Sequence, residues 1–186
     1  MGGLNRRDAM GVMTSNVDGG LTLHAEPLTA EAFRPFGDVV DRRALGPILA
    51  INGGTAQRLH DLTRIDVARG GHAAISVVRA QARTLPFRIE CMERHLLGSQ
   101  AWLPLGGARW IVVVSAPGRR PAGPSLRAFV ASDMQGVNYR RGTWHHPLIA
   151  LGADAEFLVV DRVADDGRED CEVVDFAAQD VRVVVA

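Results

Sequence analysis

The sequence predicts an all-β fold, a sandwich or barrel assembled from many short strands. Short apolar and β-branched runs recur along the whole chain, and clusters rich in Gly, Pro, Asn or Asp separate them, as at 117–118, 121–124 and 165–167. Such spacing is typical of sandwiches and barrels, and no long run carries the apolar stripe of a helix. The runs expected as strands are 39–41, 48–51, 73–79, 87–95, 100–103, 109–115, 126–131, 136–140, 148–151, 156–163 and 171–175.

A single domain is expected between a leader segment and a C-terminal tail. Residues 1–20 are Gly-rich without periodicity and predict a disordered leader. The domain is expected over 21–176, beginning with a short alternating strand at 21–25. Residues 177–186 are expected as a C-terminal tail. Three alternatives remain for 181–186: an edge strand, a subunit contact or a flexible end.

One short helix is expected near the start of the domain. Thr29 can act as its N-cap, Glu31 lies in its first turn, and Gly37 follows its last residue. The expected helix therefore covers 30–36, and Pro35 keeps it brief.

Composition excludes several classes of function. The 186 residues are 47% hydrophobic, enough for one domain with a sizeable core. The formal net charge is zero, with 21 basic residues, all arginine, and 21 acidic ones, so no nucleic-acid partner is expected. Apolar runs are too short to cross a membrane, and the two cysteines form neither a zinc knuckle nor a disulfide framework. We expect a soluble, cytoplasmic protein.

Two polar segments predict a shared pocket. Residues 93–100 contain the spacing E-x-H-x4-Q, and residues 141–147 end in His145-His146-Pro147. Side chains alternate between the faces of a strand, so Phe87, Ile89, Cys91, Glu93 and His95 are expected on one buried face. A buried carboxylate must bind a metal, pair with a cation or accept a hydrogen bond. The alternative is that Glu93 and His95 form a purely structural pair that links neighbouring strands.

The two spacings resemble the ligand segments of the cupin barrel, H-x-H-x4-E and G-x-x-H, with altered residue types. The resemblance implies a cupin-like β-barrel of the jelly-roll type with few short helices. It places Glu93, His95 and His145 at the polar centre, as catalytic groups or as ligands of a divalent metal. It also favours His145 over the adjacent His146 as the inward-facing histidine, while the neutral amide of Gln100 suits hydrogen bonding to substrate better than metal binding.

Four ordered blocks extend the resemblance to one family. Residues 28–39, 51–62, 92–101 and 136–148 resemble ureidoglycolate lyases, and the similarity covers roughly 21–176. Two positions depart from the family pattern: Leu96 replaces a proline, and Arg140 replaces a histidine. Arg140 cannot serve as a base at neutral pH, but it can bind a carboxylate.

The resemblance implies a reaction and a set of roles. Ureidoglycolate is a carbinolamine that breaks into glyoxylate and urea, a step of allantoin and purine degradation. A histidine would transfer a proton, with Glu93 of raised pKa as its partner. The expected substrate-binding residues are Arg58, His60, Asp61, Gln100, Arg140, Trp144 and His146.

Several alternatives stay open beside this reading. Trp144 is either pocket wall or core, and without the resemblance His60 and Asp61 would be ordinary loop residues. The family implies a divalent metal such as nickel and no organic cofactor. A homodimer is expected because barrels of this kind often pair through exposed edge strands. The competing functions are a metal-dependent cupin enzyme and a cupin that binds a small acid, acting on a related ureido or 2-hydroxy acid.

Overall fold

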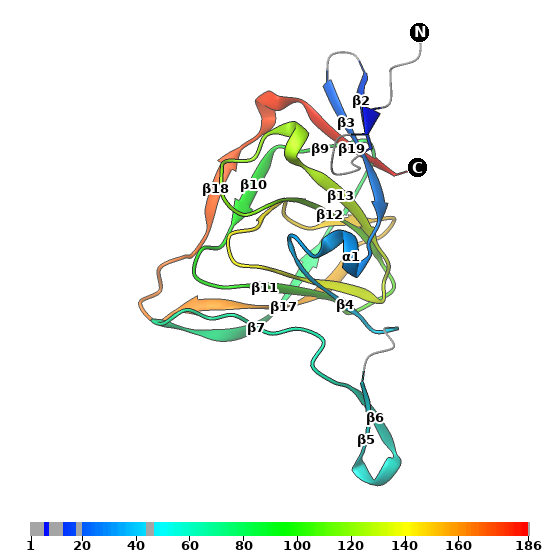
Figure 1. The fold of residues 1–186 in the computed structure, drawn as a ribbon, viewed down its shortest axis with the longest axis vertical. Helices are drawn as coiled ribbons and strands as arrows, with labels where there is room; N and C mark the ends of the chain where they lie inside the picture. The colour runs from blue at the N-terminus through cyan, green and yellow to red at the C-terminus, as the bar shows by residue number, and fades with distance from the viewer. Residues whose placement is uncertain (1–5, 8–12, 18–19, 44–46, 186) are drawn as a thin grey trace.

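The computed structural model describes residues 6–7, 13–17, 20–43 and 47–185. Strands dominate this part of the chain, so the all-β prediction is confirmed (Figure 1). A curled twelve-stranded sheet lies above a five-stranded sheet, and a separate two-stranded hairpin extends from the body. No helix in the described ranges is long and apolar enough to cross a membrane.

The strands of the larger sheet come from both ends and the middle of the chain. Its main path has the order β1-β2-β3-β13-β12-β15-β10-β18, and β16, β8, β19 and β9 join beside it. Their bounds are β1 Arg6–Arg7, β2 Met13–Val17, β3 Gly20–Pro27, β8 Ala82–Arg83, β9 Phe87–Arg88, β10 Cys91–Arg94, β12 Arg109–Ser115, β13 Arg127–Ala131, β15 Trp144–His145, β16 Ile149–Leu151, β18 Glu172–Asp175 and β19 Val181–Val185.

The smaller sheet is antiparallel and has the order β4-β14-β11-β17-β7. Its strands are β4 Gly37–Asp41, β14 Gln135–Tyr139, β11 Gln100–Pro104, β17 Ala155–Ala164 and β7 Gly71–Ala80, and the hairpin consists of β5 Ile48–Ile51 and β6 Ala56–Leu59. Short 3-10 turns lie at Asn52–Gly54, Gly123–Ser125 and Ala177–Gln179.

Strand β12 connects the two halves of the core. Its residues alternate between two buried clusters, with Ile111 and Val113 in one and Trp110, Val112 and Val114 in the other. A strand that is apolar on both faces must be covered on both. The run at 109–115 is therefore the centre of the fold, and the prediction of a strand there is confirmed.

The helix is shorter than the sequence predicts. It covers only α1 Ala30–Phe33, and Thr29 Oγ1 accepts the amide of Ala32 as the predicted N-cap. Phe33 is fully buried and packs its ring against Phe129. The apolar contact of this one side chain fixes the turn, and the chain then enters β4 at Gly37.

The predicted strand 87–95 is interrupted, so its expected single face is wrong. Ile89 and Met92 are both fully buried in the same core cluster, although they are three residues apart. The backbone changes partner between them, because the Ile89 amide donates to Val181 while the Glu90 carbonyl accepts from Phe176. Glu93 therefore does not share a regular strand face with Ile89.

Both ends of the expected domain extend further than the sequence indicates. Met13–Val17, inside the expected disordered leader, pairs antiparallel with β3; residues 1–5, 8–12 and 18–19 lie outside the described part. In the expected tail, β19 lies between β3 and β9 rather than at an edge. Val181 and Val183 are fully buried there, which is why this strand is interior.

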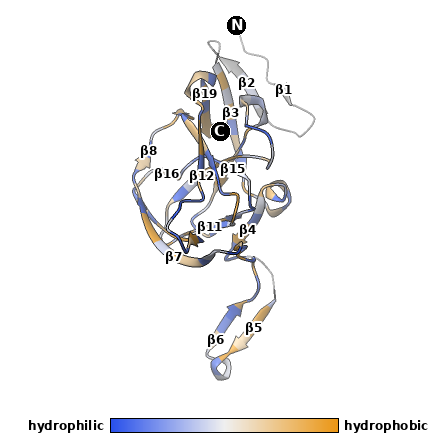
Figure 2. Cartoon of the chain, turned by 90° about the vertical axis from the view of Figure 1, so that its left-hand side faces the viewer, coloured by the Kyte–Doolittle hydropathy of each residue, from blue (hydrophilic) through white to orange (hydrophobic). Residues whose placement is uncertain are grey.

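The β5–β6 hairpin, which we call the arm, projects away from both sheets (Figures 1 and 2). Its turn needs left-handed backbone at three successive residues, Asn52, Gly53 and Gly54, with φ of 53°, 66° and 93°. Two glycines and an asparagine are the residues that adopt this conformation at low cost. All four residues of β5 are exposed.

Candidate functional site

Adjacent strands bring the predicted polar centre together. Glu93 of β10 lies directly opposite His145 of β15 in the antiparallel ladder, and His95 follows the end of β10. His145 Nε2 lies 3.3 Å from Glu93 Oε1, and the rings of His95 and His145 are 5.4 Å apart. One ligand atom from each of the three residues lies within 4.8 Å of the others.

The main chain orients both imidazoles. Nδ1 of His95 lies 2.7 Å from the carbonyl of Asp170, and Nδ1 of His145 lies 3.0 Å from the carbonyl of Thr143. A carbonyl can only accept, so Nδ1 of each ring carries a proton. Both Nε2 atoms are buried; among the described residues neither makes a hydrogen bond of good geometry, and His145 Nε2 has only its 3.3 Å contact with the Glu93 carboxylate. Tyr139 stacks on the His145 ring at 4.2 Å and 15°.

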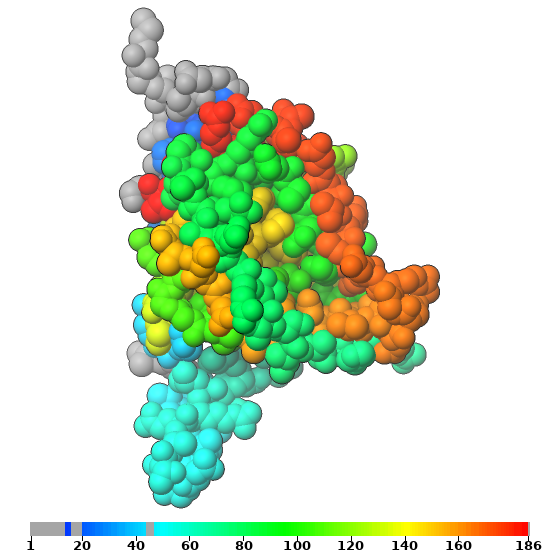
Figure 3. Space-filling view, turned by 180° about the vertical axis from the view of Figure 1, so that it is seen from behind, coloured from blue at the N-terminus to red at the C-terminus, as the bar shows by residue number. Residues whose placement is uncertain are grey.

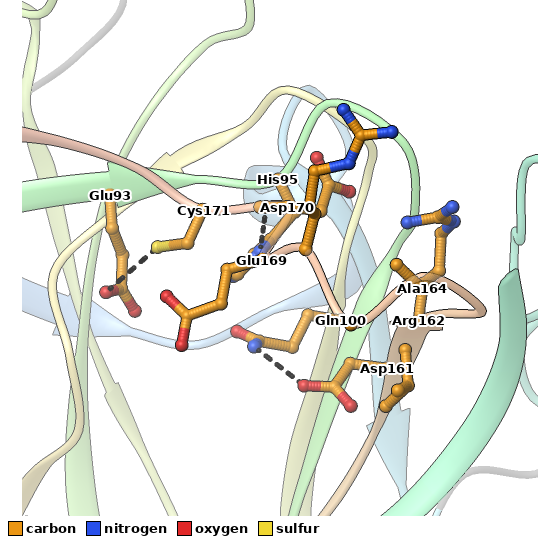
Figure 4. Close-up of a pocket in the computed structure, with 12 residues that line it drawn as sticks. Glu93, His95, Gln100, Asp161, Arg162, Ala164, Glu169, Asp170 and Cys171 are labelled. Carbon is orange, nitrogen blue, oxygen red and sulfur yellow. Dashed lines mark hydrogen bonds between the residues drawn. The ribbon is translucent and has the colours of Figure 1, made fainter. Parts of the chain in front are cut away.

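These residues adjoin a cavity of about 360 Å³. Figure 4 shows Glu93, His95 and Gln100 on its walls, with Glu169 extending toward the same space. His145 is 1% exposed and lies behind Glu93 rather than on the wall. A small molecule in the cavity would therefore meet Glu93 and His95 first.

Neighbouring groups fix the amide of Gln100. Its Oε1 accepts from Trp102 Nε1 at 2.8 Å, and its Nε2 donates to Asp161 Oδ2 at 3.3 Å. The oxygen is thus occupied, which leaves the second N–H as the group that can bind a ligand. This arrangement suits a hydrogen-bond donor and not a metal ligand.

The surroundings of Glu93 contradict the expectation that its pKa is raised. Burial alone raises the pKa of Glu93, but the neighbouring His145, and beyond it His95 and His146, outweigh burial and hold this pKa below its usual value of 4.5. The predicted raised pKa is therefore wrong, and Glu93 is a carboxylate at neutral pH. Burial, and then Glu93 itself, raise the pKa of Cys171 to about 11, so its thiol stays protonated beside the carboxylate at 3.8 Å.

Two expected site residues lie elsewhere in the body of the protein. Trp144 belongs to the core and is 1% exposed; its indole N–H donates to the Arg119 carbonyl, and Arg94 covers its ring at 4.3 Å. Arg140 is exposed and donates to the Arg34 carbonyl at 3.2 Å, away from the cavity wall. Of the two open readings of Trp144, the structure favours core.

His146 follows the end of β15 and packs against Phe87. Its Nδ1 lies 2.7 Å from the Pro147 carbonyl, and its ring meets Phe87 edge-on at 5.4 Å. Burial lowers its pKa and so favours the neutral imidazole. His146 does not line the cavity.

The remaining expected residues belong to the arm and its connection. Arg58 lies in β6, while His60 and Asp61 follow it. All three are exposed, and Asp61 lies 3.9 Å from Arg64. None of them lines the cavity within one copy of the chain.

The sequence did not indicate the segment that closes the cavity. Asp161 of β17 and the loop from Gly167 to Cys171 form one wall. Asp170 organises this wall, since its carboxylate accepts the amides of Leu96 and Leu97 and its carbonyl meets His95. An acidic, Gly-containing run resembles any exposed turn, so no local signal could have identified it.

The three polar groups are suited to a divalent cation. Two buried imidazole nitrogens, neither of which makes a hydrogen bond of good geometry within the described ranges, and a carboxylate form a donor set that transition metals accept. The carbonyl partners of both Nδ1 atoms are the outer contacts that usually orient metal-binding histidines. Glu93, His95 and His145 would be the ligands.

The fold and the site together define an all-β protein with a small acidic pocket built on a Glu–His–His centre. Comparison with known proteins gives the family. The family model described as ureidoglycolate lyase matches residues 20–184, so the chain belongs to the ureidoglycolate lyase family and is a lyase.

Individual relatives agree with this assignment. The chain is 53% identical to a ureidoglycolate lyase of Burkholderia mallei over 79% of this chain and 85% of the relative. It is 50% identical to one of Brucella melitensis over 80% and 86%. Among solved structures, a dTDP sugar isomerase from Desulfovibrio desulfuricans G20 matches 75% of this chain and 85% of its own, with 16% identity and a TM-score of 0.42.

Proposed function

We propose that this protein cleaves ureidoglycolate into glyoxylate and urea, as a cytoplasmic step in the degradation of allantoin. The observation that carries the proposal is an ionised, partly buried Glu93 on the wall of a small cavity, beside two oriented imidazoles. Family membership and relatives named for this activity support the choice of substrate.

The reaction needs one proton to move within the substrate. The hydroxyl of ureidoglycolate loses its proton, the bond from carbon to the urea nitrogen breaks, and that nitrogen gains a proton. Glu93 Oε1 faces His145, and Oε2, which the Cys171 thiol approaches at 3.8 Å, is the oxygen that accepts the hydroxyl proton. The same oxygen then returns the proton to the departing nitrogen, and the step consumes neither water nor a net proton.

The remaining lining residues hold the substrate. The free N–H of Gln100 donates to a substrate oxygen, and the Asp161 and Trp102 contacts keep it in place. A divalent ion held by Glu93, His95 and His145 would polarise the hydroxyl and neutralise its developing charge.

Release of glyoxylate and urea by the purified protein tests the proposal. Protein prepared without chelators should produce both above the spontaneous rate, and metal content should be measured on the same sample. If a divalent ion is required, chelation should remove activity and one added metal should restore it. Absence of glyoxylate with every divalent metal tried would overturn the assignment.

A further inference from the structure

The arm exposes an apolar strand that one copy of the chain leaves uncovered. Ile48, Leu49 and Ile51 of β5 are 51%, 43% and 37% exposed. A two-stranded hairpin alone is marginally stable in water. An arm with this surface therefore needs a protein surface against it.

A second apolar surface lies on the outer face of the smaller sheet. Phe157 and Val159 of β17 point into the core, so their neighbours in the ladder point outward. Val160 and Leu158 are those neighbours, and they lie opposite Ile75 and Val77 of the edge strand β7. Ile75 and Val77 are 71% and 56% exposed.

The two surfaces lie on one side of the molecule. Figures 1 and 3 show the arm below one end of the smaller sheet and the 164–171 loop at the other end. A two-fold axis across the outer face of this sheet would exchange these ends. The arm of a second copy would then run beside the first copy's loop, which is a wall of the cavity.

Charge makes the two regions complementary. The wall of the cavity carries Glu93, Asp161, Glu169 and Asp170. Its two arginines are engaged: Arg162 donates to the Ala68, Arg69 and Gly70 carbonyls, and Arg168 pairs with Asp166. Arg58 on the arm is exposed and has no ion pair within the described part of its own chain.

We propose that a second copy of this chain covers the β7–β17 face with its arm and brings the partner's Arg58 to Glu169 at the cavity mouth. Each active site then contains residues of two chains. That Arg58 binds the substrate carboxylate rests on the proposed function. The docking of the arm does not.

Disulfide trapping tests the docking without any catalytic assay. Cys171 lies two residues from Glu169, so Arg58→Cys should give a disulfide-linked dimer on mild oxidation. The dimer should be absent from the Arg58→Cys/Cys171→Ser double variant and from Arg182→Cys, whose side chain lies on β19. No linked dimer, or one that survives loss of Cys171, would overturn the docking.

Light scattering tests the surface. The wild-type protein should be dimeric at micromolar concentration, and Ile75→Asp should shift it to monomer because it buries a charge. Ser76→Asp changes the opposite face of the same strand and should leave the dimer intact. A monomeric wild-type protein, or equal effects of the two substitutions, would contradict the proposal.

Complementation separates a shared site from a site within one chain. Arg58→Glu and Glu93→Gln should each be nearly inactive as pure dimers. Unfolded and refolded together in equal amounts, they form mixed dimers with one intact site, and activity should return to about one quarter of wild type. No recovery from dimeric mixtures of an active enzyme would show that the arm does not act on its partner; inactivity of the wild-type protein would instead count against the proposed function.

Discussion

Glu93 combines two properties that seldom occur together in one carboxylate. It is largely buried, yet neighbouring imidazoles hold its pKa below 4.5. A buried group that remains ionised can accept a proton at neutral pH and return it within the same pocket. At the scale of single residues, function therefore depends on how His145 and His95 are placed around this side chain.

Glu93→Gln removes the negative charge and keeps the shape of the side chain. General acid–base groups contribute about 10²–10⁴-fold to rate, so we expect kcat to fall by that factor with an unchanged thermal melting curve. His145→Ala should lower kcat by a similar factor. Steady-state kinetics measure both, and a near wild-type kcat in Glu93→Gln would remove it from the mechanism.

The pH profile follows from the direction of the Glu93 shift. A lowered pKa keeps the carboxylate ionised as pH falls, so kcat/KM should stay level from neutrality to about pH 5 and decline only below it. Circular dichroism at each pH controls for acid unfolding. A decline between pH 7 and pH 5 with a half-point near 6, in folded protein, would mean that another group titrates in this step.

Substitutions at Gln100, inside the cavity, and at Arg140, outside it, form a matched pair of tests for substrate binding. Gln100 lines the cavity, so Gln100→Ala should raise KM more than it changes kcat. Arg140 binds a main-chain carbonyl outside the cavity, and Arg140→His should change kcat/KM less than about threefold. A gain of activity in Arg140→His would instead show that the departure from the family pattern weakens the enzyme.

The sequence indicated which three polar residues lie together but not what surrounds them. Glu93, His95 and His145 could be predicted because the two segments that carry them resemble the ligand segments of the cupin barrel. Trp144 could not be assigned from spacing, since core and pocket wall look alike in a β run. Asp170 acts mainly through its carbonyl and its contacts with backbone amides, which sequence patterns do not show.

At the scale of elements, most strands were predictable and their partners were not. Runs such as 48–51 and 109–115 are strands as predicted. The exception within 87–95 arises because Ile89 and Glu90 bond to Val181 and Phe176, which are remote in sequence. Long-range pairing also explains why β19 is interior although it resembles an edge.

Ending the chain after Asp180 tests the role of β19. Val181 and Val183 are fully buried, and burial of a valine side chain contributes about 1.5–3 kcal/mol. The truncated protein should therefore lose a large share of its stability in urea unfolding, whereas Arg182→Ala on the exposed side of the strand should change it by less than about 1 kcal/mol. Equal stability of truncated and full-length protein would contradict an interior β19.

At the scale of the whole molecule, the arm lies away from the cavity beside Glu93. The arm carries Arg58, and its connection carries His60 and Asp61, all exposed and away from the cavity of their own chain. Sequence similarity marks these residues as a block but cannot say in which copy of the chain they act. Assembly depends on exposed surfaces such as the one that carries Ile75 and Val77. A strand pattern shows that these residues are apolar but not that a partner covers them.

Following racemic ureidoglycolate by NMR with the purified wild-type protein tests the central claim most directly. We expect equal amounts of glyoxylate and urea, formed well above the spontaneous rate, while one enantiomer of the substrate remains. Glu93→Gln, prepared and metallated in the same way, should reproduce the spontaneous rate. Product formation at the spontaneous rate in both samples, or products other than glyoxylate and urea, would contradict the account.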